Sequence, residues 1–266
     1  MKPIVLPGRP DNSDPLEYLC RADEQGFLLA PGETPESFAE RVGKQVRDLP
    51  KNLPEGLPEA AERVRADAEA VTEDLYGFRA AWLPVYYSTA ETGRFSAGVS
   101  LFPDDSLPLV YLSGAFLKKP SHRGYTAGET LAHEAVHAAR LAFPDDSAYD
   151  EYFPCQVHSS AFRRLAGNLF RRWYIPLIFF LGLVIAPLCL LTLLLPAAVL
   201  LAEFILLLRI RTAKKKIRSL GLRPEPVLLR LSDAEIRTLA AGKLPSCLSD
   251  KTSLRYRLFF RRFSLE

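Results

Sequence analysis

Residues 126–143 read TAGETLAHEAVHAARLAF, and this stretch decides how the rest of the chain is interpreted. His133 and His137 are four positions apart, so on a helix they lie on one face and can bind one metal ion. Glu134, next to the first histidine, is then placed to accept a proton from water that the metal has made more acidic. The stretch therefore predicts a helix that carries a metal site.

The expected ends of this helix are also visible in the sequence. Thr126 and Glu129 have the spacing of a capping box, and Pro144 follows as a stop signal. All 4 histidines of the chain, His122 among them, fall between residues 122 and 158. This clustering favours a metal site over a helix that carries two histidines by chance.

The HEAVH motif resembles that of the zincin metallopeptidases, and in particular the gluzincin branch, in which a glutamate on a following helix is the third zinc ligand. The resemblance covers residues 80 to 165, and HEAVH is its specific part. It implies Zn²⁺ bound by His133, His137 and Glu151, with Glu134 as the general base. Pro154 departs from the pattern because proline is tolerated only in the first turn of a helix or at a kink. Asp150 or His158 could therefore replace Glu151.

Other groups near this motif have alternative interpretations. His158 is expected two turns beyond Glu151 and could donate a hydrogen bond to the oxyanion that forms at an attacked carbonyl, although a structural role is favoured. Tyr149 and Tyr152 are rivals for the same role. Cys155 is better explained as a packed thiol than as a ligand.

Charge is divided unevenly along the 266 residues. Residues 11–74 contain 16 acidic and 7 basic side chains, whereas residues 160–266 contain 19 basic and 6 acidic ones. The basic half surrounds the most apolar segment, which favours an anionic membrane surface over nucleic acid as its partner. The 4 cysteines form no C-x-x-C pair and the N-terminus lacks a secretory signal, so we expect a reduced, intracellular chain.

Before the metal helix, the patterns predict helices and then a sheet. Helices are expected at 16–21, 34–48 and 58–76, the last with Gly77 as its stop. Short aromatic and β-branched runs between residues 81 and 112 predict a small antiparallel sheet. The run Leu109 to Leu112 is a candidate edge strand for binding a substrate backbone, or else a strand that only builds the core. Residues 114–125 are expected to be a loop in which Lys118, Lys119, His122 and Arg123 are solvated.

After the metal helix, we expect one helix over residues 155–170 and then a membrane segment. Residues 173–208 contain 36 residues with a single charged side chain, Glu203. This is long for one membrane crossing and short for two, so it predicts a helical hairpin that is transmembrane or re-entrant, with a turn near Leu191 to Pro196. Basic residues on both flanks predict that both ends stay in the cytoplasm. Trp173 suits the interface, and Glu203 is a functional candidate because a charge in lipid is costly.

The last part of the chain is expected to be a basic tail. Ser232 and Glu235 predict a capped helix that ends at Gly242. The final run, LRYRLFFRRF, could lie on the bilayer surface or form a strand.

Together these patterns predict an α+β protein in three parts. Residues 1–172 would be a mainly helical, zincin-like cytoplasmic catalytic domain with an irregular or helical lead-in at 1–57, residues 173–210 a membrane hairpin, and residues 211–266 a cytoplasmic tail. The expected function is that of a zinc endopeptidase, with a protein or peptide substrate, integral to the inner (cytoplasmic) membrane and with both termini in the cytoplasm. The alternatives are a membrane-bound scaffold or regulator with a structural or absent metal, and a non-peptidase hydrolase.

Overall fold

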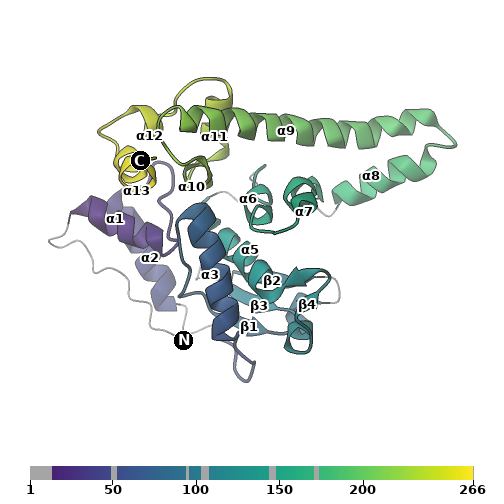
Figure 1. Ribbon diagram of the computed structural model, residues 1–266, viewed down its shortest axis with the longest axis horizontal. Coiled ribbons are helices and arrows are strands. Elements are labelled where there is room, and N and C mark those ends of the chain that lie inside the picture. Colours follow the sequence, from purple (N-terminus) through teal and green to yellow (C-terminus); the bar gives the residue numbers. More distant parts are fainter. Residues whose placement is uncertain are drawn as a thin grey trace.

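The computed structural model of the protein describes residues 14–48, 53–93, 96–102, 108–143, 148–170 and 174–265. The first elements in this part of the chain are three helices, α1 (Pro15–Glu24), α2 (Pro35–Asp48) and α3 (Glu62–Tyr76) (Figure 1). The expected helices at 16–21 and 34–48 are confirmed, and Gly77 ends α3 in the left-handed conformation that favours glycine. Pro144 and Trp173 lie outside the described residues.

Helix α3 begins at Glu62, four residues later than the start predicted at Pro58. The residues before it are extended: the amide of Ala60 donates to the carbonyl of Val85 at 2.9 Å, and the amide of Tyr87 donates to that of Pro58 at 2.9 Å. Pairing with the sheet therefore replaces the first turn that the apolar spacing predicted.

The central sheet is mixed, so the prediction of an antiparallel sheet is wrong in this respect. Its strand order is β1 (Val85–Tyr87), β3 (Leu109–Leu112), β2 (Gly98–Leu101); β3 pairs parallel with β1 and antiparallel with β2. The run Leu109 to Leu112 is thus the buried central strand and not an edge strand. Among the described strands, the open edge of the sheet on this side belongs to β2. A short helix, α4 (Thr89–Thr92), follows β1.

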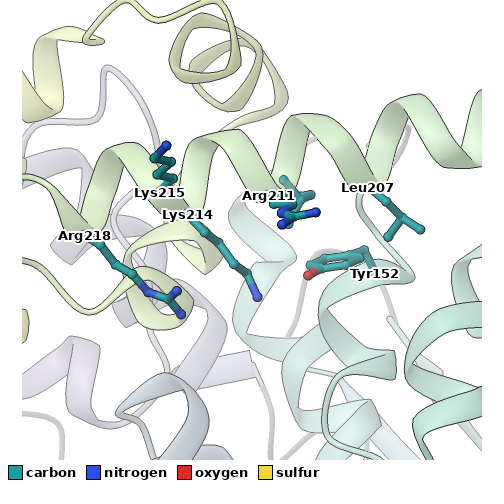
Figure 2. A pocket seen from close by; sticks show the side chains of 7 residues that line it. Tyr152, Leu207, Arg211, Lys214, Lys215 and Arg218 are labelled. Carbon is teal, nitrogen blue, oxygen red and sulfur yellow. The ribbon is translucent and has the colours of Figure 1, made fainter.

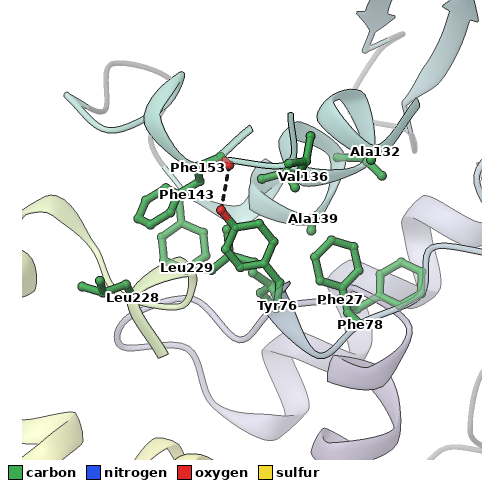
Figure 3. Close-up of a cluster of buried hydrophobic side chains, with 14 of the residues drawn as sticks. Phe27, Tyr76, Phe78, Ala132, Val136, Ala139, Phe143, Phe153, Leu228 and Leu229 are labelled. Atoms are coloured by element: carbon green, nitrogen blue, oxygen red, sulfur yellow. Dashed lines mark hydrogen bonds between the residues drawn. The ribbon is translucent and has the colours of Figure 1, made fainter. Parts of the chain in front are cut away.

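Helix α5 (Ala127–Ala139) carries the HEAVH motif and packs between the sheet and α3. The predicted capping box is present, with the amide of Glu129 donating to the Thr126 hydroxyl at 3.1 Å. Figure 3 shows Ala132, Val136 and Ala139 of α5 directed into the hydrophobic core. Before α5 lie the turn η2 (Gly114–Leu117) and a hairpin of β4 (Ser121–His122) with β5 (Tyr125–Thr126), and η3 (Arg140–Ala142) follows it.

The single helix predicted over residues 155–170 is instead interrupted. Helix α6 is the one turn Tyr152–Cys155, and α7 (Ala161–Ala166) and η4 (Gly167–Phe170) follow after an irregular stretch. Gly167 lies so close to Cys155 that an added Cβ would be 2.2 Å from its Sγ. The chain can therefore fold back on α6, because only glycine permits this approach.

Two apolar helices, α8 (Tyr174–Ile185) and α9 (Leu194–Arg218), run side by side as a hairpin that projects from the body (Figure 1). The chain turns between Ile185 and η5 (Leu190–Leu193), earlier than the predicted Leu191 to Pro196. Gly182 explains the close approach, because a Cβ there would be 2.7 Å from Cδ of Pro196.

Within the described residues, Leu190–Arg218 is long and apolar enough to cross a membrane. Helix α8 has 12 residues, about 18 Å at a rise of 1.5 Å per residue, and is too short to cross alone. The far end of α9 is part of the body, where Ile210, Ala213 and Ile217 are buried.

Residues after α9 pack into the body and do not form a free tail. They form α10 (Pro224–Leu229), α11 (Asp233–Ala240), α12 (Ser246–Ser249) and α13 (Leu254–Phe263). The capping box at Ser232 and Glu235 is confirmed. The run LRYRLFFRRF is a helix, α13, and neither a strand nor a bilayer-surface segment, because Leu258, Phe259 and Phe263 are buried in the same core as α1.

A buried ion pair joins the two ends of the chain. Arg230 is 1% exposed and donates to both carboxylate oxygens of Asp23, at 2.6 and 2.9 Å. It also donates to the carbonyls of Tyr76 and Pro226, at 3.0 and 2.7 Å. Arg262 forms a second ion pair with Asp23. Burial lowers the pKa of Arg230 to about 9, and the charge is tolerated because its donors are satisfied.

We expect Asp23→Ala to lower the free energy of unfolding by about 3–5 kcal/mol, because it leaves a buried guanidinium without its partner. Glu17→Ala removes an exposed ion pair with Arg21 and should cost less than about 1 kcal/mol. Denaturant unfolding in detergent can be followed by fluorescence of Trp82, which stacks on Phe27. Equal losses in the two variants would show that the buried pair does not hold the termini together.

Candidate metal centre

Helix α5 presents His133, Glu134 and His137 to one cavity of about 870 Å³. The opposite face of α5 is held close to α3, since a Cβ on Gly128 would be 2.9 Å from Cβ of Asp67. Small residues let α5 pack tightly on that side, and this packing fixes the rotation of the helix about its axis. The rotation of the helix in turn decides that the histidine side chains face the cavity.

Glu151 meets both histidines in this cavity. Its Oε2 is 3.5 Å from Nε2 of His133, and its Oε1 is 3.6 Å from Nε2 of His137. One candidate ligand atom from each of the three residues lies within 4.8 Å of the others. Ligand atoms about 2.0–2.2 Å from a tetrahedral zinc are about 3.3 Å apart, so this donor set fits a zinc ion with small adjustments.

The position of Glu151 depends on a hydrogen bond from α3. The hydroxyl of Tyr76 donates to the carbonyl of Phe153 at 2.7 Å, in the buried cluster drawn in Figure 3. This bond attaches the single turn α6 to the helix that packs against α5. Pro154 lies within that turn, and Glu151 is the residue immediately before it.

Asp150 and Glu151 occupy different sides of His137. Asp150 Oδ1 is 3.7 Å from Nδ1 of His137, whereas Glu151 faces Nε2. Burial lowers the pKa of His137, but the hydrogen bond with Asp150 and the charges of Glu151 and Glu134 outweigh it and raise that pKa. Asp150 is therefore placed to orient the imidazole, whereas Glu151 faces the nitrogen that could bind a metal.

The environment of His133 favours the neutral form of its imidazole, which is the form that binds a metal. Burial holds its pKa well below the usual value, with His137 and His158 acting in the same direction. Its Nδ1 is buried and makes no hydrogen bond within the described residues.

Glu134 is held by the edge strand. The hydroxyl of Ser100 in β2 donates to Oε2 of Glu134 at 2.6 Å, and burial raises the pKa of this carboxyl. Gly98 permits the close contact between β2 and α5, because a Cβ there would be 2.6 Å from Cγ2 of Thr130. The general-base candidate is thus oriented by a strand that also lines the cavity.

His158 lies beside the site although it is not on a helix that continues from Glu151. Its ring stacks on that of His133, with centroids 5.4 Å apart, and lies 5.1 Å from that of Tyr125. Glu129 reaches the same segment by accepting from the amide of Ser159 at 2.9 Å. Burial lowers the pKa of His158.

A second group of candidate ligands consists of His133, Cys155 and His158. Burial raises the pKa of the Cys155 thiol to about 12, so its ionisation, which metal binding requires, is costly. The first group, with two imidazoles and a carboxylate, is the better metal site.

Some residues that line the cavity were not singled out by the sequence patterns. Other residues that the patterns did single out lie outside the cavity. Ser100, Tyr125 and Arg163 line the cavity, with Arg163 stacked over the Tyr125 ring at 3.7 Å. A lone serine or tyrosine in a strand gives no sequence signal. Tyr149 and Tyr152, the rival oxyanion donors, do not line this cavity.

Of the loop residues expected to be solvated, only Arg123 lines the cavity within the described part of the chain; Lys118, Lys119 and His122 do not. Glu203 accepts hydrogen bonds from the side chain of Asn168, at 2.9 and 3.1 Å, and so lies against η4.

Comparison of the chain with protein-family models, with curated proteins and with solved structures gives no match. The geometry of the site is therefore the basis for any functional assignment.

We expect Glu151→Ala to weaken zinc affinity by more than about 100-fold. Loss of a residue that only hydrogen-bonds to a metal ligand typically costs about 10–100-fold, and loss of a ligand itself should cost more. Asp150→Ala and His158→Ala should fall within that smaller range. Competition with a chromogenic chelator measures all three. A larger loss in Asp150→Ala than in Glu151→Ala would exchange the roles assigned to the two carboxylates.

Proposed function

We propose that this chain is a zinc-dependent endopeptidase anchored to a membrane by the α8/α9 hairpin. The observation that carries the proposal is the meeting of His133, His137 and Glu151 in one cavity with the carboxylate of Glu134. Two imidazoles and one carboxylate leave a fourth position open on a tetrahedral metal, which is the arrangement of catalytic sites. The zincin resemblance of HEAVH agrees with this donor set.

A zinc ion bound there would supply Lewis-acid polarisation of water and of a substrate carbonyl. Glu134 accepts the proton from water at its carboxylate and later returns it to the leaving amine. Its raised pKa brings it closer to neutral pH and makes both transfers easier. Ser100 donates to one oxygen of Glu134 and so fixes the orientation of its carboxylate.

The open edge of β2 is the candidate binding surface for an extended substrate. β2 pairs only with β3 among the described strands, and its residues from Gly98 to Ser100 line the cavity. A peptide added at this edge would satisfy unpaired backbone groups of β2 and would place its carbonyl near Glu134. This edge, next to a cavity of about 870 Å³, favours a peptide over a small hydrolase substrate.

His158 and Tyr125 are the candidate donors to the oxyanion, because both line the cavity. The stack of His158 on His133 also supports the structural role, in which His158 orients a ligand. A scaffold with a structural metal is the second candidate function, favoured by the His133, Cys155 and His158 group. The raised pKa of the Cys155 thiol, which makes its ionisation costly, argues against this second candidate.

We expect Glu134→Gln to keep its zinc and fold but to lose roughly 10²–10⁴-fold in peptide hydrolysis, because the amide cannot accept the proton. Cleavage of a peptide library in detergent, read by mass spectrometry, measures this. Glu73→Gln, on the exposed face of α3, is the matched control. Full hydrolysis by Glu134→Gln would refute this mechanism, and a wild-type protein that binds zinc without cleaving any peptide would favour the scaffold.

The exposed side chains of the hairpin support its insertion in lipid. Leu177, Phe180 and Val184 of α8 are more than half exposed, as is Leu194 at the start of α9. An apolar surface this large is unstable in water. Because α8 is too short to cross alone, the hairpin suits a re-entrant insertion, with basic flanks and both termini on the cytoplasmic side.

We expect Lys2→Cys and Glu266→Cys to be labelled from the same, cytoplasmic side of sealed vesicles by an impermeant thiol reagent. Cys189, exposed in the hairpin turn, serves as an internal probe because the other three cysteines are buried. Its protection from both sides would indicate a re-entrant hairpin, and labelling from the far side two spans. Termini labelled on opposite sides would contradict the hairpin.

A further inference from the structure

A second cavity, of about 400 Å³, lies between α6 and the end of α9. Four basic side chains of α9 line it, and Figure 2 shows them along one stretch of the helix: Arg211, Lys214, Lys215 and Arg218. The ring of Tyr152, with Leu207 toward the apolar end, forms the other part of the lining.

The positive charge of this cavity is only partly compensated. Glu225 lies 3.3 Å from Nζ of Lys214 and 3.7 Å from Nη2 of Arg218. Within the described part of the chain, no carboxylate forms an ion pair with Arg211 or Lys215, and both are exposed. The cavity therefore has an excess of cationic donors for an anion with several oxygen acceptors, such as a phosphate.

The position of these residues along α9 matches the headgroup layer of a membrane. Leu208 is the last residue of the apolar stretch, and at 1.5 Å per residue Arg211 lies about 4.5 Å and Lys215 about 10 Å beyond it. The polar layer of each leaflet is about 5–7 Å thick, so the backbone of Arg211 lies within it and that of Lys215 just outside it. Side chains on a helix tilt toward its N-terminus, which for α9 is the apolar end, so the Lys215 side chain reaches back toward this layer. Leu207, on the membrane side of Arg211, adds an apolar wall where the acyl chains of a lipid begin.

We propose that this cavity binds the phosphate-bearing headgroup of an anionic phospholipid. Arg211 and Lys215 contact the phosphate and the remaining headgroup oxygens, while Lys214 stays between Glu225 and the Tyr152 ring, 5.9 Å from its centroid. The apolar wall and the depth along α9 select a lipid over a soluble phosphate. This site rests on the proposed insertion of the α8/α9 hairpin in a membrane, but not on zinc or on hydrolysis.

The test uses the full chain in a mild detergent and counts retained lipid by native mass spectrometry during titration with short-chain phosphatidylglycerol. Arg211→Gln/Lys215→Gln should bind about 30-fold more weakly than wild type, since each basic residue near an anionic surface contributes about fivefold. Lys216→Gln/Arg257→Gln removes the same charge outside the cavity and should bind within about threefold of wild type. Short-chain phosphatidylcholine and inorganic phosphate form the comparison arms.

Each outcome bears on the proposal. Selective, saturable binding of one phosphatidylglycerol that the cavity variant loses and the control retains supports it. Equal loss in both double variants would mean unspecific charge attraction and would overturn it. Equal binding of phosphatidylcholine would overturn it too, and inorganic phosphate competing at the same concentration would identify a site for soluble phosphate instead. Single Lys215→Gln and Lys216→Gln variants give the same contrast if a double variant misfolds.

Discussion

The buried contact between Arg230 and Asp23 is the constraint on which the rest of the molecule depends. One guanidinium, through four hydrogen bonds, joins the first helix, the end of α3 and the α10 turn. The same guanidinium also positions the end of α5 through α10, because Arg140, which follows α5, donates to the carbonyl of Leu229 in α10 at 2.6 Å. Two segments at opposite ends of the sequence thus form the support behind the site.

The local parts of this structure could be predicted from the sequence. The capping boxes at Thr126 and Ser232, and the left-handed stop at Gly77, depend on residues that are neighbours in the chain. The spacing of His133 and His137 is likewise a helical property. Such signals need no knowledge of the tertiary structure, and for this reason the ends marked by these caps agree with the structure.

The remaining features depend on contacts between distant residues. The parallel pairing of β1 with β3 makes Leu109 to Leu112 a core strand, which is the second of the two roles expected for it, and no local pattern encodes this pairing. Ser100 reaches Glu134 only because the two elements meet in space. The run LRYRLFFRRF is amphipathic with either helical or strand periodicity, and packing on α1 decides in favour of the helix.

The continuity of α9 has a mechanical consequence. The helix that leaves the apolar hairpin is the same one that enters the core through Ile210, Ala213 and Ile217, without an intervening linker. A flexible tether would let the body rotate and drift above the bilayer, whereas a continuous helix transmits its own tilt to everything packed on it. If α9 is seated in a bilayer as proposed, the depth of its insertion sets the height and the facing direction of the cavity around His133, and bilayer thickness then decides which molecules can reach that cavity.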